Sequence, residues 1–336
     1  MCTPFTTQTL LSLFRTNQAL ANILLLFYIA VLRGVLFYTG TPVMPESSGI
    51  WSMEFYRYIG EDLWLLPWFS IGIILIQAVF VNFIAARYRL SEEITLFSGS
   101  FYILLCSGIG DLANLPPALL ANSFLILIIY LLFDSYRQNN PAPAIFNIGL
   151  WTGIGSFFQF SFLLFVLLGV IGLNIVRSWS IKEIFMLVSG IATTYFLCGS
   201  VYYLSDAFPL FIEEQFSKNL AFLSFDIQSS AVAVVERGLV LMLIVISVFS
   251  QGIYAYKRNI QVQKFQSILF WAMIVAALAA LFQFNAGAEQ LVFVMPTLSF
   301  FMMYHFTRLK SSVAETLHLI WVLLVIVLQL HQYLGF

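Results

Sequence analysis

The chain has 336 residues, of which 61% are hydrophobic and 9% charged, and its mean hydropathy is +0.93. Soluble domains average about 45–50% apolar and about 25% charged residues. A soluble globule cannot cover so much apolar surface, so the composition excludes that class and indicates an integral membrane protein. The three cysteines lie far apart, which excludes a cysteine zinc site or a disulfide framework as the organising element.

Apolar runs of the length that a spanning helix needs, about 20 residues, recur along the chain. We expect an all-α polytopic bundle of about 11 spans, the shorter ones buried in protein. The runs are 18–38, 64–86, 94–109, 117–136, 144–158, 160–176, 184–204, 238–256, 265–284, 291–306 and 313–334. The stretch 144–176 is too long for one span and short for two, so it predicts either two spans or a hairpin of short helices that turns near Gln159–Ser161.

Basic residues gather in alternate loops between these runs. If the N-terminus is cytoplasmic, the cytoplasmic segments hold 11 basic and 5 acidic residues, and the opposite side holds 3 basic and 11 acidic residues. This asymmetry follows the positive-inside rule. It predicts an odd number of spans, with a cytoplasmic N-terminus and a C-terminus on the opposite, outer side of the membrane.

The whole chain, 1–336, reads as one integral membrane domain without a soluble domain. Its longest loops are about 39–63 and 205–237, both on the predicted outer face. No G-x-x-x-x-G-K motif is present, so we expect no nucleotide site, no cofactor and no nucleic-acid partner.

The first outer loop carries the densest group of charges. Glu54, Arg57, Glu61 and Asp62 lie within nine residues. A helix over 51–62 would place the first three on one face and aromatic side chains on the other. Carboxylates at a membrane surface can act as a general base or bind a metal. The alternative is that acids crowd outer loops because basic residues are excluded there.

The second outer loop predicts an amphipathic helix on the membrane surface. Asp206 is the expected N-cap and Pro209 lies in the first turn. Apolar residues then follow helical spacing from Phe208 to Leu223. Such a helix could serve as a lid over a site or as a simple connector.

Arg33 is the one charge well inside a predicted span. A charge at midspan costs about 2.5–3.5 kcal/mol on translocon scales. The side chain is expected either to snorkel outward or to bind a lipid phosphate with its guanidinium.

Other polar or small residues within the spans favour helix packing. Gln77, Asn82 and Asn122 are expected to hydrogen bond between helices, and Gly149 and Gly153 to allow close approach. Near the predicted inner ends, Glu315 and His318 form an E-x-x-H pair with His305 in reach. The chain has three histidines, so a hydrogen-bond cluster is favoured over a metal site.

Several stretches resemble an uncharacterised family of multi-pass inner-membrane proteins of Bacteroidota. They are LFRTNQALANILLLFYIAVLR, IQAVFVNFIAARYRLSEE, LANLPPALLANSF and AIFNIGLWTGIGSFFQFSFLLFVLLGVIGLNIVRSW. These are not catalytic motifs, so this resemblance implies a location and no reaction.

The chain also resembles, more distantly, the GT-C class of membrane glycosyltransferases. The shared features are many spans, an acidic first outer loop and short helices on the outer face. Those enzymes transfer a sugar from a polyprenyl-phosphate donor. The resemblance implies that Glu54, Glu61 or Asp62 is the base on the acceptor hydroxyl. It implies that Arg33, Arg57 or Arg237 holds the leaving phosphate. The chain departs from the class in its short first loop and its lack of D-x-D.

Three functions are therefore open. The first is an envelope glycosyltransferase that uses a lipid-linked sugar at the outer face. The second is a non-catalytic membrane subunit or scaffold of an envelope assembly or secretion complex, with envelope proteins as partners. The third is a carrier for a lipid-linked substrate, which the near absence of midspan charge disfavours. Membrane lipids are expected partners in each case.

Overall fold

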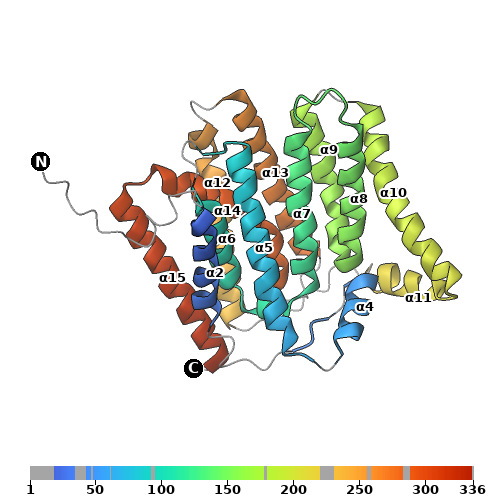
Figure 1. Cartoon of the computed structure of the whole chain (residues 1–336), viewed down its shortest axis with the longest axis horizontal. Helices are drawn as coiled ribbons and strands as arrows, with labels where there is room; N and C mark the ends of the chain where they lie inside the picture. Colours follow the sequence, from blue (N-terminus) through green and yellow to red (C-terminus); the bar gives the residue numbers. More distant parts are fainter. Residues whose placement is uncertain are drawn as a thin grey trace, which may run out of the picture.

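The computed structural model describes residues 19–34, 43–46, 48–60, 62–91, 95–177, 180–219, 231–255, 259–282 and 288–334. Within these ranges the protein has 13 α-helices and no strands (Figure 1). They are α2 (Ala19–Arg33), α4 (Ile50–Ile59), α5 (Leu65–Arg87), α6 (Phe97–Ser107), α7 (Pro117–Asp134), α8 (Ala142–Phe158), α9 (Phe165–Val176), α10 (Ile181–Leu204), α11 (Phe208–Ile212), α12 (Ala231–Ala255), α13 (Ile260–Phe282), α14 (Met295–Arg308) and α15 (Ser311–Leu334). Short 3₁₀ segments add η1 (Gly110–Asn114), η2 (Phe160–Leu164) and η4 (Ala288–Val294).

The all-α class predicted from composition is confirmed, and each predicted apolar run contains a helix. Among the described residues, five helices are long and apolar enough to cross a membrane alone: α5, α7, α10 and the greater parts of α13 and α15. Parts of α2, α6, α8 and α9 are apolar but shorter. Helices of this length and composition identify a membrane protein.

The stretch 144–176 forms two helices joined by a tight 3₁₀ turn, as the sequence predicts. α8 ends at Phe158 because Gln159 adopts an extended conformation, and η2 then leads into α9. The backbone N–H of Phe160 donates to the carbonyl of Ser48 at 3.0 Å. This bond ties the turn to the segment that precedes α4.

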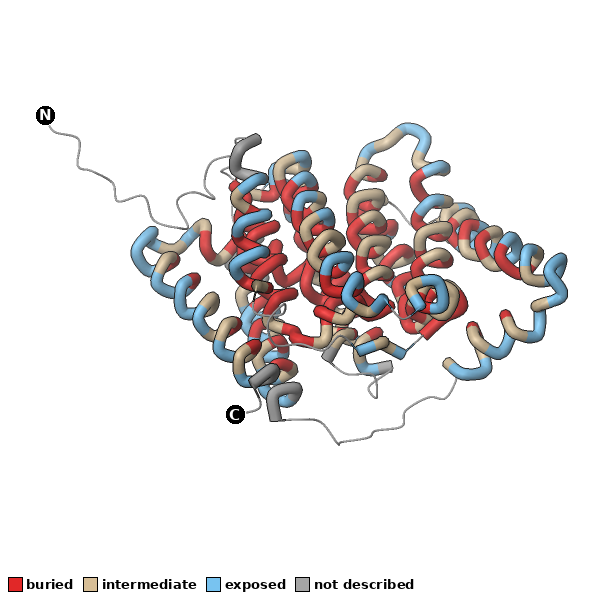
Figure 2. The backbone as a smooth tube through the Cα atoms, turned by 60° about the horizontal axis from the view of Figure 1, so that its bottom comes forward, coloured by how far each residue is buried: buried red, intermediate tan, exposed pale blue. Residues whose placement is uncertain are grey.

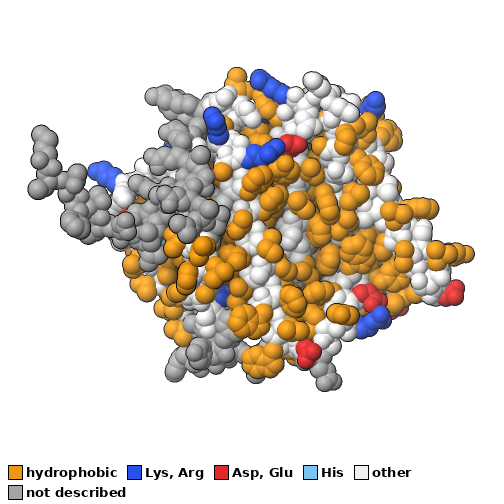
Figure 3. Space-filling model, viewed as in Figure 1, with side chains coloured by type: hydrophobic (Ala, Val, Ile, Leu, Met, Phe, Trp, Pro, Cys, Tyr) orange, Lys and Arg blue, Asp and Glu red, His pale blue; other side chains and the backbone are white. Residues whose placement is uncertain are grey.

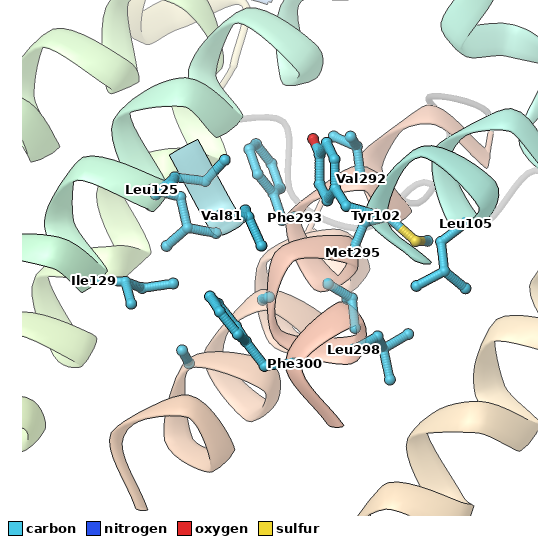
Figure 4. Packing of buried hydrophobic residues seen from close by; sticks show 14 of the residues in the cluster. Val81, Tyr102, Leu105, Leu125, Ile129, Val292, Phe293, Met295, Leu298 and Phe300 are labelled. Carbon is cyan, nitrogen blue, oxygen red and sulfur yellow. The ribbon is translucent and has the colours of Figure 1, made fainter. Parts of the chain in front are cut away.

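The main hydrophobic core surrounds two short helices. Every residue of α6 is buried, and so are most residues of α14. Figure 4 shows Tyr102, Leu125, Phe293 and Phe300 converging between α6, α7 and α14. Figure 2 shows that buried residues are concentrated in the middle of the bundle, while α10, α11 and α15 at its sides expose much of their length. Because α6 and α14 are screened from lipid, they can carry more polar residues than a helix that faces the lipid.

Polar side chains connect the core helices, which confirms the prediction for Gln77, Asn82 and Asn122. Asn122 Nδ2 donates to the Tyr102 hydroxyl at 2.8 Å, and that hydroxyl donates to Gln77 Oε1. Gln77 Nε2 donates to the Leu119 carbonyl at 2.9 Å. Asn82 Oδ1 accepts hydrogen bonds from Ser98 and Gly99 on α6. These bonds join α5, α6 and α7 where water is excluded.

The two ends of the bundle differ in charge. We call the end that carries α4, η1 and α11 the α4 face, and the opposite end the basic face. In Figure 3 basic side chains lie along the edge of the basic face, and acidic ones lie near the α4 face. α4 and α11 cross the end of the bundle rather than continuing it (Figure 1).

In the second outer loop the structure differs from the sequence prediction in two details. The N-cap of α11 is Ala207 and not Asp206, because Asp206 takes a left-handed conformation with φ 54°. α11 ends at Ile212 and continues as a π-helical turn, η3 (Glu213–Ser217), which shifts the helical register. That shift buries Gln215 beside Phe211. The predicted residues from 220 to 230 lie outside the described ranges.

Candidate functional site

An apolar groove of about 300 Å³ opens to the outside of the bundle between α8 and α10, beneath α4. It faces the lipid side, since Leu197 and Val201 on α10 are 59% and 62% exposed. The groove is lined by Trp51, Leu150, Ile154, Phe157, Thr193, Thr194, Leu197, Cys198, Val201 and Tyr202.

Glycines explain why the groove lies toward the α4 face. A Cβ added at Gly149 would lie 1.9 Å from the Leu187 carbonyl oxygen, and one at Gly190 would lie 2.3 Å from the Phe146 carbonyl oxygen. α8 and α10 therefore touch backbone to backbone near the middle of each helix. Toward the α4 face α10 leans away from α8, toward α11 (Figure 1). The predicted role of the glycines in close packing is confirmed.

α4 is fixed over the end of this groove by buried contacts. Gln215 accepts a hydrogen bond from Ile50 N (3.2 Å) and donates to the Ser156 carbonyl (2.9 Å). The Trp51 ring lies 5.1 Å from the ring of Phe157. Gly49 allows the start of α4 to lie this close to α8, since a Cβ there would lie 2.3 Å from the Phe157 carbonyl oxygen. Sequence analysis missed Gln215, because the π-helical turn that buries it leaves no signal in apolar spacing.

Glu54 and Arg57 form an ion pair on α4, one turn beyond Trp51. Their closest atoms are 2.6 Å apart, and the Arg57 side chain is 74% exposed. Tyr202, which lines the groove, lies near enough to interact electrostatically with both charges. The structure thus brings one predicted carboxylate and one predicted arginine to the mouth of an apolar groove.

α4 ends before the other two predicted acids of the first loop. α4 ends at Ile59 because Gly60 takes a positive φ of 62°, so the predicted helix over 51–62 extends three residues too far. Asp62 follows the turn and is exposed. Glu61 lies outside the described residues.

Arg33 neither snorkels nor reaches the α4 groove. It is 1% exposed, and its guanidinium donates to the Cys106 carbonyl (2.9 Å), the Ser70 hydroxyl (3.0 Å) and the Leu112 carbonyl (3.4 Å). α6 ends at Ser107, so these carbonyls lie near the end of that helix and within η1, where intrahelical partners are lacking. Arg33 therefore stabilises the turn between α6 and α7.

A second group of charges surrounds η1. Glu236 on α12 is 4% exposed, and a carboxylate oxygen accepts a hydrogen bond from Gly110 N at 3.3 Å. Asp111 interacts electrostatically with Glu236 and with Glu289, and Glu289 also interacts with Glu46. The predicted phosphate ligand Arg237 lies here, beside Glu236, and not at the groove.

Two of these carboxyls hold protons near neutral pH. Burial, reinforced by Asp111, raises the pKa of Glu236 and of Glu289 to about 7 in each case. The Gly110 N–H and Arg237 act in the opposite direction on Glu236. Glu236 precedes the apolar run 238–256, and Glu289 precedes the run 291–306. Neither was predicted from the sequence to be a site residue. The sequence alone does not distinguish a carboxylate in an exposed loop from one that the packed helices bury.

His318 of the E-x-x-H pair and the nearby His305 each lie within hydrogen-bond distance of a hydroxyl group. His318 Nε2 lies 2.9 Å from the Tyr28 hydroxyl, and His305 Nε2 lies 3.5 Å from the Ser250 hydroxyl. In the part of the chain that the structure describes, no three His, Cys, Asp or Glu side chains are grouped to hold a metal ion.

Comparison of the chain with protein-family models, curated proteins and solved structures finds no match.

Proposed function

We propose that the chain is a multi-pass inner-membrane protein of a bacterial cell envelope, with about 11 spans, that transfers a sugar from a polyprenyl-phosphate carrier at the α4 face. One observation carries the proposal: an apolar groove open to lipid ends at the Glu54–Arg57 ion pair. A lipid-linked substrate has the same two parts, an apolar chain and an anionic head.

The groove suits the chain of such a carrier. Its walls are apolar, and the exposed side chains of α10 leave it accessible from the bilayer. The carrier would enter sideways without leaving the membrane. Trp51 and Tyr202 form an aromatic rim at the end of the groove, a position where aromatic rings favour the membrane interface.

The ion pair suits the head. A guanidinium binds phosphate through two parallel hydrogen bonds, and Arg57 is exposed enough to receive it. Glu54 would accept the proton of the acceptor hydroxyl. That oxygen then bonds to the anomeric carbon as the bond from this carbon to the phosphate oxygen breaks. Phosphate binding would draw Arg57 from Glu54 and leave the carboxylate free to act as the base.

The proposal assigns the α4 face to the outer side of the membrane. The basic edge opposite α4 in Figure 3 supports this orientation through the positive-inside rule. The predicted cytoplasmic N-terminus and periplasmic C-terminus belong to the same proposal.

The test uses membranes that contain the full chain and undecaprenyl phosphate carrying a radiolabelled sugar. Wild type should move label from the organic-extractable lipid into a glycan or aqueous fraction, and Glu54→Gln should not. Equal transfer by both proteins would overturn the assignment of Glu54. No transfer by either, with normal folding, would favour the scaffold function.

A further inference from the structure

A second and larger groove, of about 690 Å³, lies between α5 and α7. Its surface is almost wholly apolar, and Ile76 and Phe83 at its edge are 68% and 44% exposed. Gln77 and Ser123 at its floor are hydrogen bonded to each other. The lining residues are Leu75, Ile76, Gln77, Val79, Phe80, Phe83, Ser123, Ile126 and Leu127.

This groove ends below an arginine held by aromatic rings. The Arg87 guanidinium carbon lies 5.9 Å from the ring centres of Phe83 and Tyr88 and 5.7 Å from that of Tyr130. The Arg87 side chain is 49% exposed. Cation–π contacts help to orient the guanidinium at the end of the groove.

The spacing fits one leaflet of a bilayer. At 1.5 Å per residue, Phe83 lies about 6 Å and Leu75 about 18 Å along α5 from Arg87. Half of a hydrocarbon core is about 15 Å thick. An acyl chain that starts at the level of Arg87 would thus fill the groove and end near midmembrane.

The charges around Arg87 favour an anion. Asp134 lies 3.6 Å from Arg87 Nη2, but its oxygens also accept hydrogen bonds from Tyr88 (3.4 Å) and Gln138 (2.7 Å). Asp134 is therefore shared among three donors. Three further cations, Arg89, Arg137 and Lys264, lie on or beside the same loops of the basic face.

We propose that the α5–α7 groove and Arg87 bind one anionic phospholipid from the leaflet at the basic face. One acyl chain lies in the groove, and the phosphate accepts hydrogen bonds from the guanidinium. This site lies at the end of the bundle opposite Glu54, and it does not depend on the proposed sugar transfer.

Native mass spectrometry of the full chain, titrated with phosphatidylglycerol or phosphatidylcholine in detergent, tests the site. Wild type should retain one phosphatidylglycerol in preference to phosphatidylcholine. Arg87→Gln should weaken that retention about tenfold, the scale of one charge-assisted hydrogen bond. Asp134→Asn should strengthen it, because the competing carboxylate is gone. Arg89→Gln is the matched control, since it removes the same charge from the same face outside the groove.

Equal losses in Arg87→Gln and Arg89→Gln would overturn the proposal, because they would show only a diffuse attraction to the basic face. A second variant, Leu127→Trp, fills the groove and should reduce retention of phosphatidylglycerol while Arg87 is intact. Unchanged retention in this variant would also contradict the proposal. A dimer in wild type that Leu127→Trp converts to a monomer would show that a second copy of the chain occupies the groove.

Discussion

Two regions of the α4 face carry acidic side chains in contrasting surroundings. Beside the groove, Glu54 is paired with an exposed arginine at the rim of an apolar surface. Around η1, Glu236 is buried next to another carboxylate and holds its proton near neutral pH. The sequence places both among outer-face acids, yet one is available to a ligand and the other is part of the packing. Their surroundings decide the role of each carboxylate.

α4 connects the two regions. Trp51 packs on Phe157 at the groove, and the Tyr56 hydroxyl donates to the Leu115 carbonyl just beyond η1 at 2.8 Å. Ile50 and Phe157 belong to a small hydrophobic cluster with Cys198 and Phe211, separate from the main core. Substitutions confined to one region should therefore leave the structure of the other intact, unless they displace α4.

The largest expected effect is on sugar transfer. Glu54→Gln should lower the rate at least 100-fold, the lower end of what general acid–base catalysis contributes. Arg57→Gln should lower it by about 100-fold or more, the usual loss when a donor that stabilises developing charge is removed. The label-transfer assay above measures this. Lys218→Gln is the matched control, because Lys218 pairs with Glu214 on the same face away from the groove. A loss of similar size in Lys218→Gln would remove the distinction between the two ion pairs.

The next effect is a pH dependence confined to the η1 region. Glu236 binds its proton more tightly in the folded protein than at its ordinary pKa of 4.5. Its stabilising contribution is therefore complete below pH 4.5 and is lost as the pH rises to about 7, a change of about 3 kcal/mol. Thermal unfolding in detergent should show a midpoint that falls from pH 5 to pH 8.

Glu236→Gln should lessen that fall, because an amide does not titrate, and the part due to Glu289 should remain. The exposed carboxyl of Asp62 provides the control, and Asp62→Asn should leave the pH profile as in wild type. An unaltered profile in Glu236→Gln would show that other groups cause the pH dependence.

The α8–α10 contact should be sensitive to volume. Gly149→Val places a side chain against the backbone of α10 and should destabilise the protein by about 1–3 kcal/mol. Gly72→Ala is the control, since no atom lies within 4 Å of a Cβ there and alanine favours a helix. Thermal midpoints of the two variants should move in opposite directions. Equal midpoints would contradict the close helix contact.

The smallest effect is expected for the contacts that hold α4 against α8. Gln215→Ala leaves Ile50 N and the Ser156 carbonyl without this partner, at a cost of about 1–2 kcal/mol. Tryptophan fluorescence should shift to longer wavelength as Trp51 loses its packing. An unshifted spectrum would show that α4 is held without Gln215.

Sequence reasoning predicted the helical class, the positions of the helices and the turn at Gln159 because lipid exposure imposes long apolar runs. It also predicted that Glu54 and Arg57 share a helix face. It could not find Gln215, Glu236 or the use of Arg33 on helix-end carbonyls. Those depend on contacts between segments far apart in the chain, which leave no periodic pattern.

The most direct test of the account is photo-crosslinking of a polyprenyl phosphate that carries a diazirine in its chain. The probe is added to the full chain in lipid nanodiscs, and the labelled peptides are mapped by mass spectrometry. The account predicts adducts on α8 and α10 near Ile154, Leu197 and Val201, which decrease in Arg57→Gln. Adducts on α5 and α7 alone, or adducts that Arg57→Gln leaves unchanged, would contradict it.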